Sequence, residues 1–70
     1  MILHLATLET RNYRFQALGL TEQEARAALE QAWTVHAEQT GADDWSEFSG
    51  DVSVEALETG TAYRDGSPIA

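Results

Sequence analysis

Hydrophobic and polar residues alternate in two segments near the beginning of the chain, with the period of two that is typical of β-strands. The first segment covers residues 2–8, and the second covers residues 13–18 within a strand predicted at about 12–18. The polar residues between them, Glu9–Asn12, suit a hairpin connection, and Gly19 ends the second segment. We therefore predict two antiparallel strands joined by a hairpin.

The sequence Thr21-Glu22-Gln23-Glu24 is the clearest local signal in the chain and marks the start of a helix. The Thr21 hydroxyl can accept the backbone N–H of Glu24, and the Glu24 carboxylate can reach back to the N–H of Thr21, which together form a capping box. Gly41 suits the left-handed conformation at which many helices end. The pattern predicts one helix over about residues 21–40.

A third strand is predicted over residues 52–58, where alternation with a period of two returns. Residues 41–51 form the loop that leads into this strand. Residues 62–64 would make a short fourth strand, and residues 65–68 then form a closing turn.

The resulting order of elements, ββαβ(β), predicts an α+β fold in a single domain of residues 1–70. The directions of the elements place strand 52–58 antiparallel to strand 2–8. The strand order is then 2-1-3, with the short fourth strand outside the third. A single helix packs on one face of this three- to four-stranded antiparallel sheet, and the other face stays in water.

The alternation also predicts which side chains meet in the core. On the sheet we expect Leu3, Leu5, Tyr13, Phe15, Val52 and Val54 to face the helix. On the helix we expect the buried positions to be Ala25, Ala28, Leu29, Ala32 and Trp33. The open face of the sheet would carry His4, Arg14, Gln16, Ser53 and Glu55.

The chain contains two histidines, and each is a candidate for general acid–base chemistry. His4 would lie opposite Glu55 on adjacent strands, which is an ordinary surface pair as well as a candidate general base. His36 falls on the apolar side of the helix in its last turns, where we expect a half-buried side chain.

Metal binding and nucleophilic catalysis have little support in the sequence. Residues 44–55 begin and end with acids like a calcium loop, but Phe48 and Ser49 stand where an oxygen ligand and a turn glycine are needed. The serines lie in no nucleophile motif, and the chain contains no Cys and no Lys. We therefore expect no catalytic, cofactor or metal site and no enzymatic activity.

The charge of the chain is concentrated in one stretch. Between Ala27 and Tyr63 there are eight acids and no Lys or Arg, whereas the charges elsewhere cancel, so the formal net charge of −8 arises here. Such a field repels nucleic acid and anionic membranes and attracts basic surfaces. An acidic surface also keeps a small domain soluble, and this is the simplest interpretation of the stretch.

Two large aromatic residues, Trp45 and Phe48, lie within the acidic loop. One interpretation is that both fold back and close the open end of the core between helix and sheet. The other is that they are anchors for a partner, because aromatic residues ringed by carboxylates suit a basic pocket. The candidate partner-binding residues are Glu30, Glu38, Asp43, Asp44, Trp45, Glu47, Phe48, Asp51, Glu55 and Glu58.

These features favour a small acidic, non-enzymatic inhibitor of a basic, nucleic-acid-handling protein, in which carboxylates imitate the phosphates of DNA. In size, acidity and lack of catalytic motifs the chain is similar to the small anti-defence inhibitors of phages, including anti-CRISPR and DNA-mimic proteins. That likeness covers bulk properties and no motif. It implies a bacterial cytoplasmic setting, a basic protein partner, and no direct contact with nucleic acid or membrane.

Two alternatives remain open from the sequence. One is a structural or regulatory interaction module, for instance a homodimer formed through the open sheet face or the free edge of strand 12–18. The other is a small-ligand enzyme. Salt distinguishes an electrostatic inhibitor from an apolar dimer, because steered binding weakens with ionic strength and apolar association does not.

Overall fold

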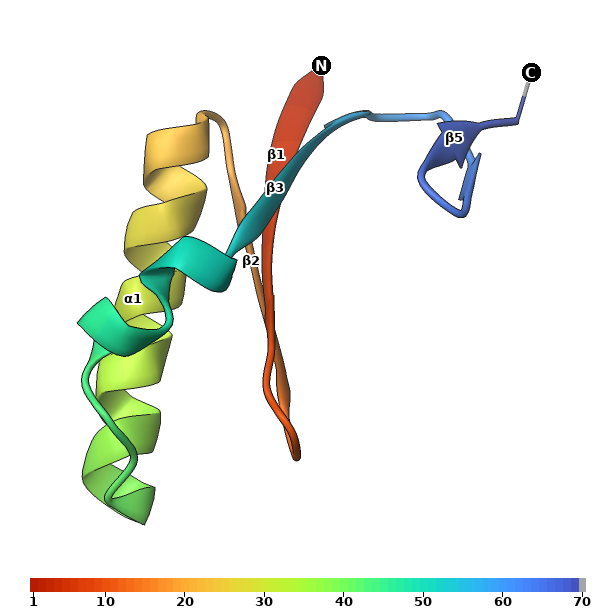
Figure 1. Ribbon diagram of the computed structural model, residues 1–70. Helices are drawn as coiled ribbons and strands as arrows, with labels where there is room; N and C mark the ends of the chain where they lie inside the picture. The colour runs from red at the N-terminus through yellow and green to blue at the C-terminus, as the bar shows by residue number, and fades with distance from the viewer. Residues whose placement is uncertain (70) are drawn as a thin grey trace.

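The computed structural model describes residues 1–69 and arranges three antiparallel strands in the order β2-β1-β3. Strand β1 spans Ile2–Glu9, β2 spans Arg14–Gly19 and β3 spans Ser53–Glu58. The helix α1, Glu22–Thr40, covers one face of this sheet (Figure 1). Two short 3₁₀ turns, η1 (Trp45–Glu47) and η2 (Ser49–Asp51), connect α1 to β3. The predicted α+β class and strand order are confirmed.

The core lies between α1 and the sheet and is small. Its fully buried hydrophobic residues are Ala6, Leu8, Ala25, Leu29, Trp33 and Val52. Phe15, Ala17, Ala37, Ala42, Trp45, Phe48 and Val54 are partly buried and pack against this cluster. The predicted core positions at Phe15, Val52 and Val54 are therefore confirmed.

The side of β1 that faces α1 differs from the prediction. Ala6 and Leu8 are buried, whereas Leu3 and Leu5, which were expected in the core, lie on the opposite face. Strand β1 has apolar residues on both sides, so alternation alone does not choose between them. The connection of residues 10–13 pairs Leu8 with Phe15, and residues directly opposite each other share a face.

The same register separates the two members of the expected His4–Glu55 pair. His4 lies opposite Ala56 on the side of α1, and Glu55 lies opposite Leu5 on the open face. The prediction of a His4–Glu55 pair on the open face is therefore wrong, since the two side chains point to opposite faces.

The buried stripe of α1 is narrower than predicted. Ala25, Leu29 and Trp33 are buried at a spacing of four, but Ala28 and Ala32 are exposed. A sheet of three strands covers only a narrow stripe of a helix, so the two alanines at its side stay in water. Tyr13 is also 53% exposed rather than buried, because it precedes β2 at the rim of the core.

Both ends of α1 have the caps that the sequence indicates. The Thr21 hydroxyl accepts the N–H of Glu24 at 3.1 Å, and Gly41 is left-handed with its N–H donated to the Ala37 carbonyl. The Glu24 carboxylate accepts the N–H of Leu20 at 3.0 Å, one residue before the expected donor. The Glu24 carboxylate therefore also fixes Leu20, the residue that precedes the cap of the helix.

Replacing the cap residue should have a modest effect. We expect Thr21→Ala to lower the free energy of unfolding by about 1 kcal/mol, because the N–H of Glu24 loses its acceptor. Urea denaturation followed by circular dichroism measures this change. Thr21→Ser, which keeps a hydroxyl, is the control; an equal loss in both variants would show that the cap bond contributes nothing.

Strand β2 meets the beginning of α1 at Gly19, which is buried. A Cβ at this position would lie 2.5 Å from the backbone N of Ala25 and 2.9 Å from the carbonyl oxygen of Thr21. Only glycine therefore allows this close approach between the end of the sheet and the first turn of the helix.

The fourth strand forms, but it does not extend the main sheet. Strand β4, Tyr63–Arg64, pairs antiparallel with β5, Ser67–Pro68, in a separate two-stranded sheet. Asp65 and Gly66 both have positive φ, at 51° and 81°, as a two-residue type I′ hairpin turn requires. The turn expected at residues 65–68 is thus the tip of a small hairpin.

Candidate functional site

The segment between α1 and β3 is held against the helix by a hydrogen bond from the core. The indole Nε1 of Trp33 donates to the carbonyl oxygen of Asp43 at 2.9 Å. The chain then passes along α1 through η1 and η2 (Figure 1). A buried side chain of the helix thereby positions the start of the acidic loop.

The two aromatic residues of this segment occupy different places. The Phe48 ring packs on the Trp33 ring with centroids 4.6 Å apart, which continues the core. Trp45 is half-buried: it packs against the core cluster and also lines two surface hollows. Both residues therefore help to close the core, as one of the two interpretations expects, and Trp45 in addition lines the surface; a role in partner binding stays a prediction.

The hollows lie on either side of Trp45, between α1 and residues 42–49, and we call them together the acidic groove. The first, of ≈ 280 Å³, is lined by Trp33, Thr34, Ala37, Glu38, Ala42, Asp44 and Trp45. The second, of ≈ 320 Å³, is lined by Gln23, Arg26, Ala27, Glu30, Trp45 and Ser49. Both are open to solvent and shallow, so they suit side chains of a partner rather than an enclosed small molecule.

The two hollows differ in charge. The first contains the carboxylates of Glu38 and Asp44 and no cation. The second contains Glu30 together with Arg26, whose guanidinium is 3.1 Å from the Glu22 carboxylate. The first hollow is therefore the more attractive for a positively charged group.

The predicted partner-binding residues are all at least partly exposed but do not share one surface. Glu30, Glu38, Asp44 and Trp45 line the acidic groove. Asp43, Glu47 and Asp51 are exposed on the same segment without lining either hollow, and Phe48 packs on Trp33. The last two acids, Glu55 and Glu58, belong to β3 on the sheet.

The wall of the groove that α1 supplies includes residues that the sequence analysis did not select. Gln23, Ala27, Thr34 and Ala37 line the hollows together with the acids of the helix. These positions recur every three to four residues beside the buried stripe of the helix, which is the periodicity that could have indicated them.

His36 lines neither hollow and lies within an aromatic cluster. Its ring is 4.8 Å from Tyr13, 4.9 Å from Phe15 and 5.2 Å from Trp33, measured between centroids. It is half-buried as expected. These contacts make it part of the packing at the rim of the core.

Residues 1–69 contain no group of three or more His, Cys, Asp or Glu side chains placed to hold a metal ion. The ends of the calcium-like segment are separated, since Asp44 lines the groove and Glu55 lies on the open sheet face. No helix within the same residues combines the length and the apolar character of a bilayer span.

Comparison with known proteins gives no match: no family model, no curated protein and no solved structure corresponds to this chain.

Proposed function

We propose that this protein is a non-enzymatic inhibitor that captures a basic segment of another protein in the acidic groove. The observation that carries the proposal is the position of Trp45 between two hollows that carboxylates border. An aromatic ring beside carboxylates recognises an arginine or lysine side chain by cation–π contact and by ion pairing at once.

The acidic stretch between Ala27 and Tyr63 supports long-range attraction of such a partner. All eight of its acids are exposed, and among residues 1–69 only Glu58 has an ion-pair partner, the Met1 amino group at 2.8 Å. Unpaired carboxylates of one sign create a summed field that raises the rate of encounter with a basic surface.

A nucleic-acid-handling protein fits this chemistry because its own ligand site is a basic groove. Glu30 and Glu38 are eight positions apart on α1, a separation of about 12 Å along the helix axis. Carboxylates displayed along the helix in this way would compete for the basic side chains that otherwise bind phosphates. On this proposal the partner's nucleic acid and this protein exclude one another.

Reversing one charge in the acidic groove should weaken binding more than the same change in net charge elsewhere, if the groove itself recognises the partner. We expect Glu38→Lys or Asp44→Lys to weaken binding of a short oligoarginine peptide at least roughly tenfold. Glu9→Lys makes the same change in net charge away from the groove and should weaken it by no more than about threefold. Isothermal titration calorimetry measures both. Equal losses would mean that only the total charge matters and would remove the groove as the site.

Two further measurements belong to the same experiment. Trp45→Ala should weaken binding by about 2 kcal/mol, roughly 30-fold, at a temperature at which circular dichroism shows it folded. Phe48→Leu, which alters the core side of the segment, is its control and should bind nearly as the parent does.

Binding to the oligoarginine peptide should also fall steeply between roughly 0.05 and 0.5 M salt. Binding that salt leaves unchanged would contradict the electrostatic mechanism.

The partner's identity and the expected bacterial cytoplasmic setting stay predictions. A candidate nucleic-acid-binding protein tests the mimicry directly, by competition between labelled DNA and this protein. A stable ternary complex with full DNA occupancy would exclude competition as the mechanism.

A further inference from the structure

The face of the sheet opposite α1 carries a cluster of leucines at one end. Leu5 lies opposite Leu18, and Leu3 lies opposite Leu57, so the four side chains occupy neighbouring positions of three strands. We call Leu3, Leu5, Leu18 and Leu57 the leucine face. Leu18 is 59% exposed and the other three are half-buried, and no helix or strand within residues 1–69 packs on this face as α1 packs on the other. An apolar patch of this kind is typical of an interaction surface.

The C-terminal hairpin projects from the body of the molecule. Residues 59–69, which we call the arm, stand away from the sheet on the side opposite α1 (Figure 1). The hairpin β4–β5 has two residues in each strand, and Ile69 is 48% exposed. A two-stranded hairpin this short is marginal in water unless another surface covers it.

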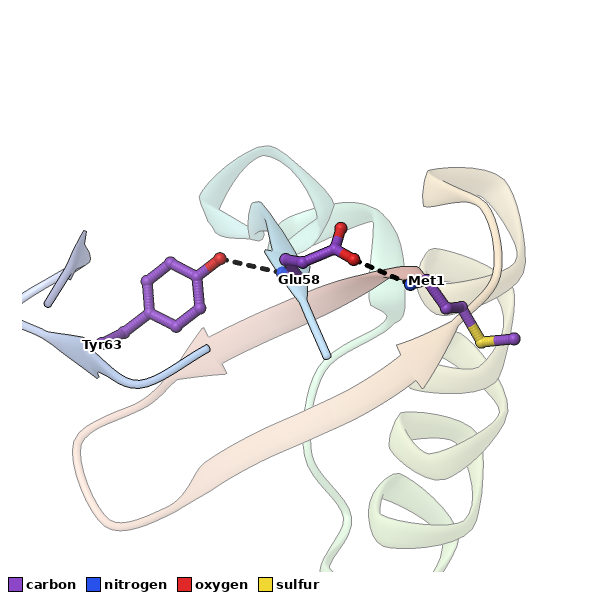
Figure 2. Close-up of polar contacts among 3 residues, drawn as sticks. All are labelled: Met1, Glu58 and Tyr63. Carbon is purple, nitrogen blue, oxygen red and sulfur yellow. Dashed lines mark hydrogen bonds and ion pairs between the residues drawn. The ribbon is translucent and has the colours of Figure 1, made fainter. Parts of the chain in front are cut away.

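The base of the arm is fixed by hydrogen bonds at the end of β3. The Tyr63 hydroxyl accepts the backbone N–H of Glu58 at 2.8 Å, while the Glu58 carboxylate binds the Met1 amino group (Figure 2). The N–H of Thr59 also donates to the Met1 carbonyl at 2.8 Å. These bonds attach the base of the arm to the end of β3 and to Met1.

The accessible surface area of the chain is larger than that expected for a compact monomer of the same mass. The chain exposes 5100 Å², whereas a compact folded protein of 7.7 kDa exposes roughly 4,300 Å². The radius of gyration of 13.2 Å likewise exceeds the value of about 11 Å expected for this length. The excess, roughly 800 Å², is of the same order as the area that one partner contributes to a standard protein interface.

The two surfaces carry few unpaired charges. On the open face Glu9 is engaged by Arg14 at 3.4 Å, so Glu55 is the carboxylate there without an ion pair among residues 1–69. The arm carries Arg64 and Asp65, neither of which has an ion pair within the same residues, so the arm has no net charge and Arg64 is its cation available to Glu55. The acids of the groove, in contrast, belong to α1 and the segment after it, on the other side of the sheet.

From these observations we infer that the leucine face and the arm form the interface of a homodimer. The arm of each copy lies on the leucine face of the other, with Arg64 near the partner copy's Glu55. This interface covers the exposed Leu18 with its half-buried neighbours and the marginal hairpin together. Both acidic grooves stay free on the outside of such a dimer.

Sedimentation equilibrium over a concentration series tests the oligomeric state of the intact chain. We expect a mass of twice 7.7 kDa, with association that persists or strengthens as salt is raised, because the contact is apolar and the net charge is repulsive. Groove binding has the opposite salt dependence. A monomer at all concentrations would overturn the dimer and leave the proposed groove unaffected.

Two changes examine the two halves of the interface separately. Leu18→Glu on the face should raise the dimer dissociation constant at least roughly 30-fold, and removal of residues 62–70 should do the same. Val35→Glu adds the same charge at a residue of α1 that is 53% exposed, and it should leave the dimer intact. Circular dichroism confirms that each variant is folded.

A mixture of the two damaged chains shows whether the contact joins different molecules. The Leu18→Glu chain keeps its arm and the shortened chain keeps its leucine face, so mixing should restore a heterodimer with one intact contact. No association in the mixture would mean that the arm lies on its own face. A dimer that survives both changes would place the interface elsewhere, for instance on the free edge of β2. Either result overturns the proposal.

Discussion

Leu29→Ala is expected to lower the free energy of unfolding by about 2–5 kcal/mol, the range for truncating a fully buried leucine. Leu29 is 1% exposed and, with Leu8 and Trp33, belongs to the large side chains that are almost completely buried. A domain of this length has a total stability of only about 4–10 kcal/mol. The substitution therefore removes a large fraction of it and can unfold the protein near body temperature.

Urea or thermal denaturation of Leu29→Ala measures the effect. Val35→Ala is the matched control, because it truncates an exposed hydrophobic residue on the same helix and should change the stability by less than about 0.5 kcal/mol. Equal melting temperatures for the two variants would mean that α1 presents a different side to the sheet. If the protein is dimeric, all melts are compared at one protein concentration.

Gly19→Ala should destabilise the protein by about 1–3 kcal/mol or more, although it adds a single methyl group. The new Cβ would lie 2.5 Å from the Ala25 nitrogen and within 3.0 Å of backbone atoms of Thr21 and Glu24. These atoms belong to the first turn of α1 and cannot move as the end of a flexible side chain could. The helix would have to shift away from β2, which disturbs the packing of Ala25 in the core.

The control for this variant is Gly50→Ala. A Cβ at Gly50 meets nothing within 4 Å and its φ is not in the left-handed region, so alanine should be neutral or slightly stabilising there. Thermal melts followed by circular dichroism compare the two. A Gly19→Ala protein as stable as the parent would show that the approach of β2 to α1 is looser than the structure describes.

The elements of this fold could be predicted because each has a strong local signal. The Thr21 cap and Gly41 define the ends of α1, and alternation identifies three strands. The orientation of β1 could not be predicted in the same way, since the side with Leu3 and Leu5 is at least as hydrophobic as the side with Ala6 and Leu8. It depends on the length of the hairpin connection, and a change of one residue in register reverses every side chain of a strand.

The candidate site was only partly predictable for a similar reason. The sequence shows which residues are acidic and that Trp45 and Phe48 lie among them. Which aromatic ring packs on Trp33 and which lines the surface depends on how η1 and η2 wind along α1. The separation of Glu55 from the groove likewise follows from tertiary structure, because the sheet places it on the face opposite the helix.

The hydrogen bond from Trp33 to the Asp43 carbonyl couples the groove to the fold as a whole. The indole ring belongs to the core, and the backbone that it holds is the beginning of the groove's second wall. A ligand that keeps this wall in place binds the native chain and not the unfolded one, so its binding free energy adds to stability by mass action. On the proposed function, a domain with so small a core would therefore be measurably more stable with its groove occupied than with its groove empty.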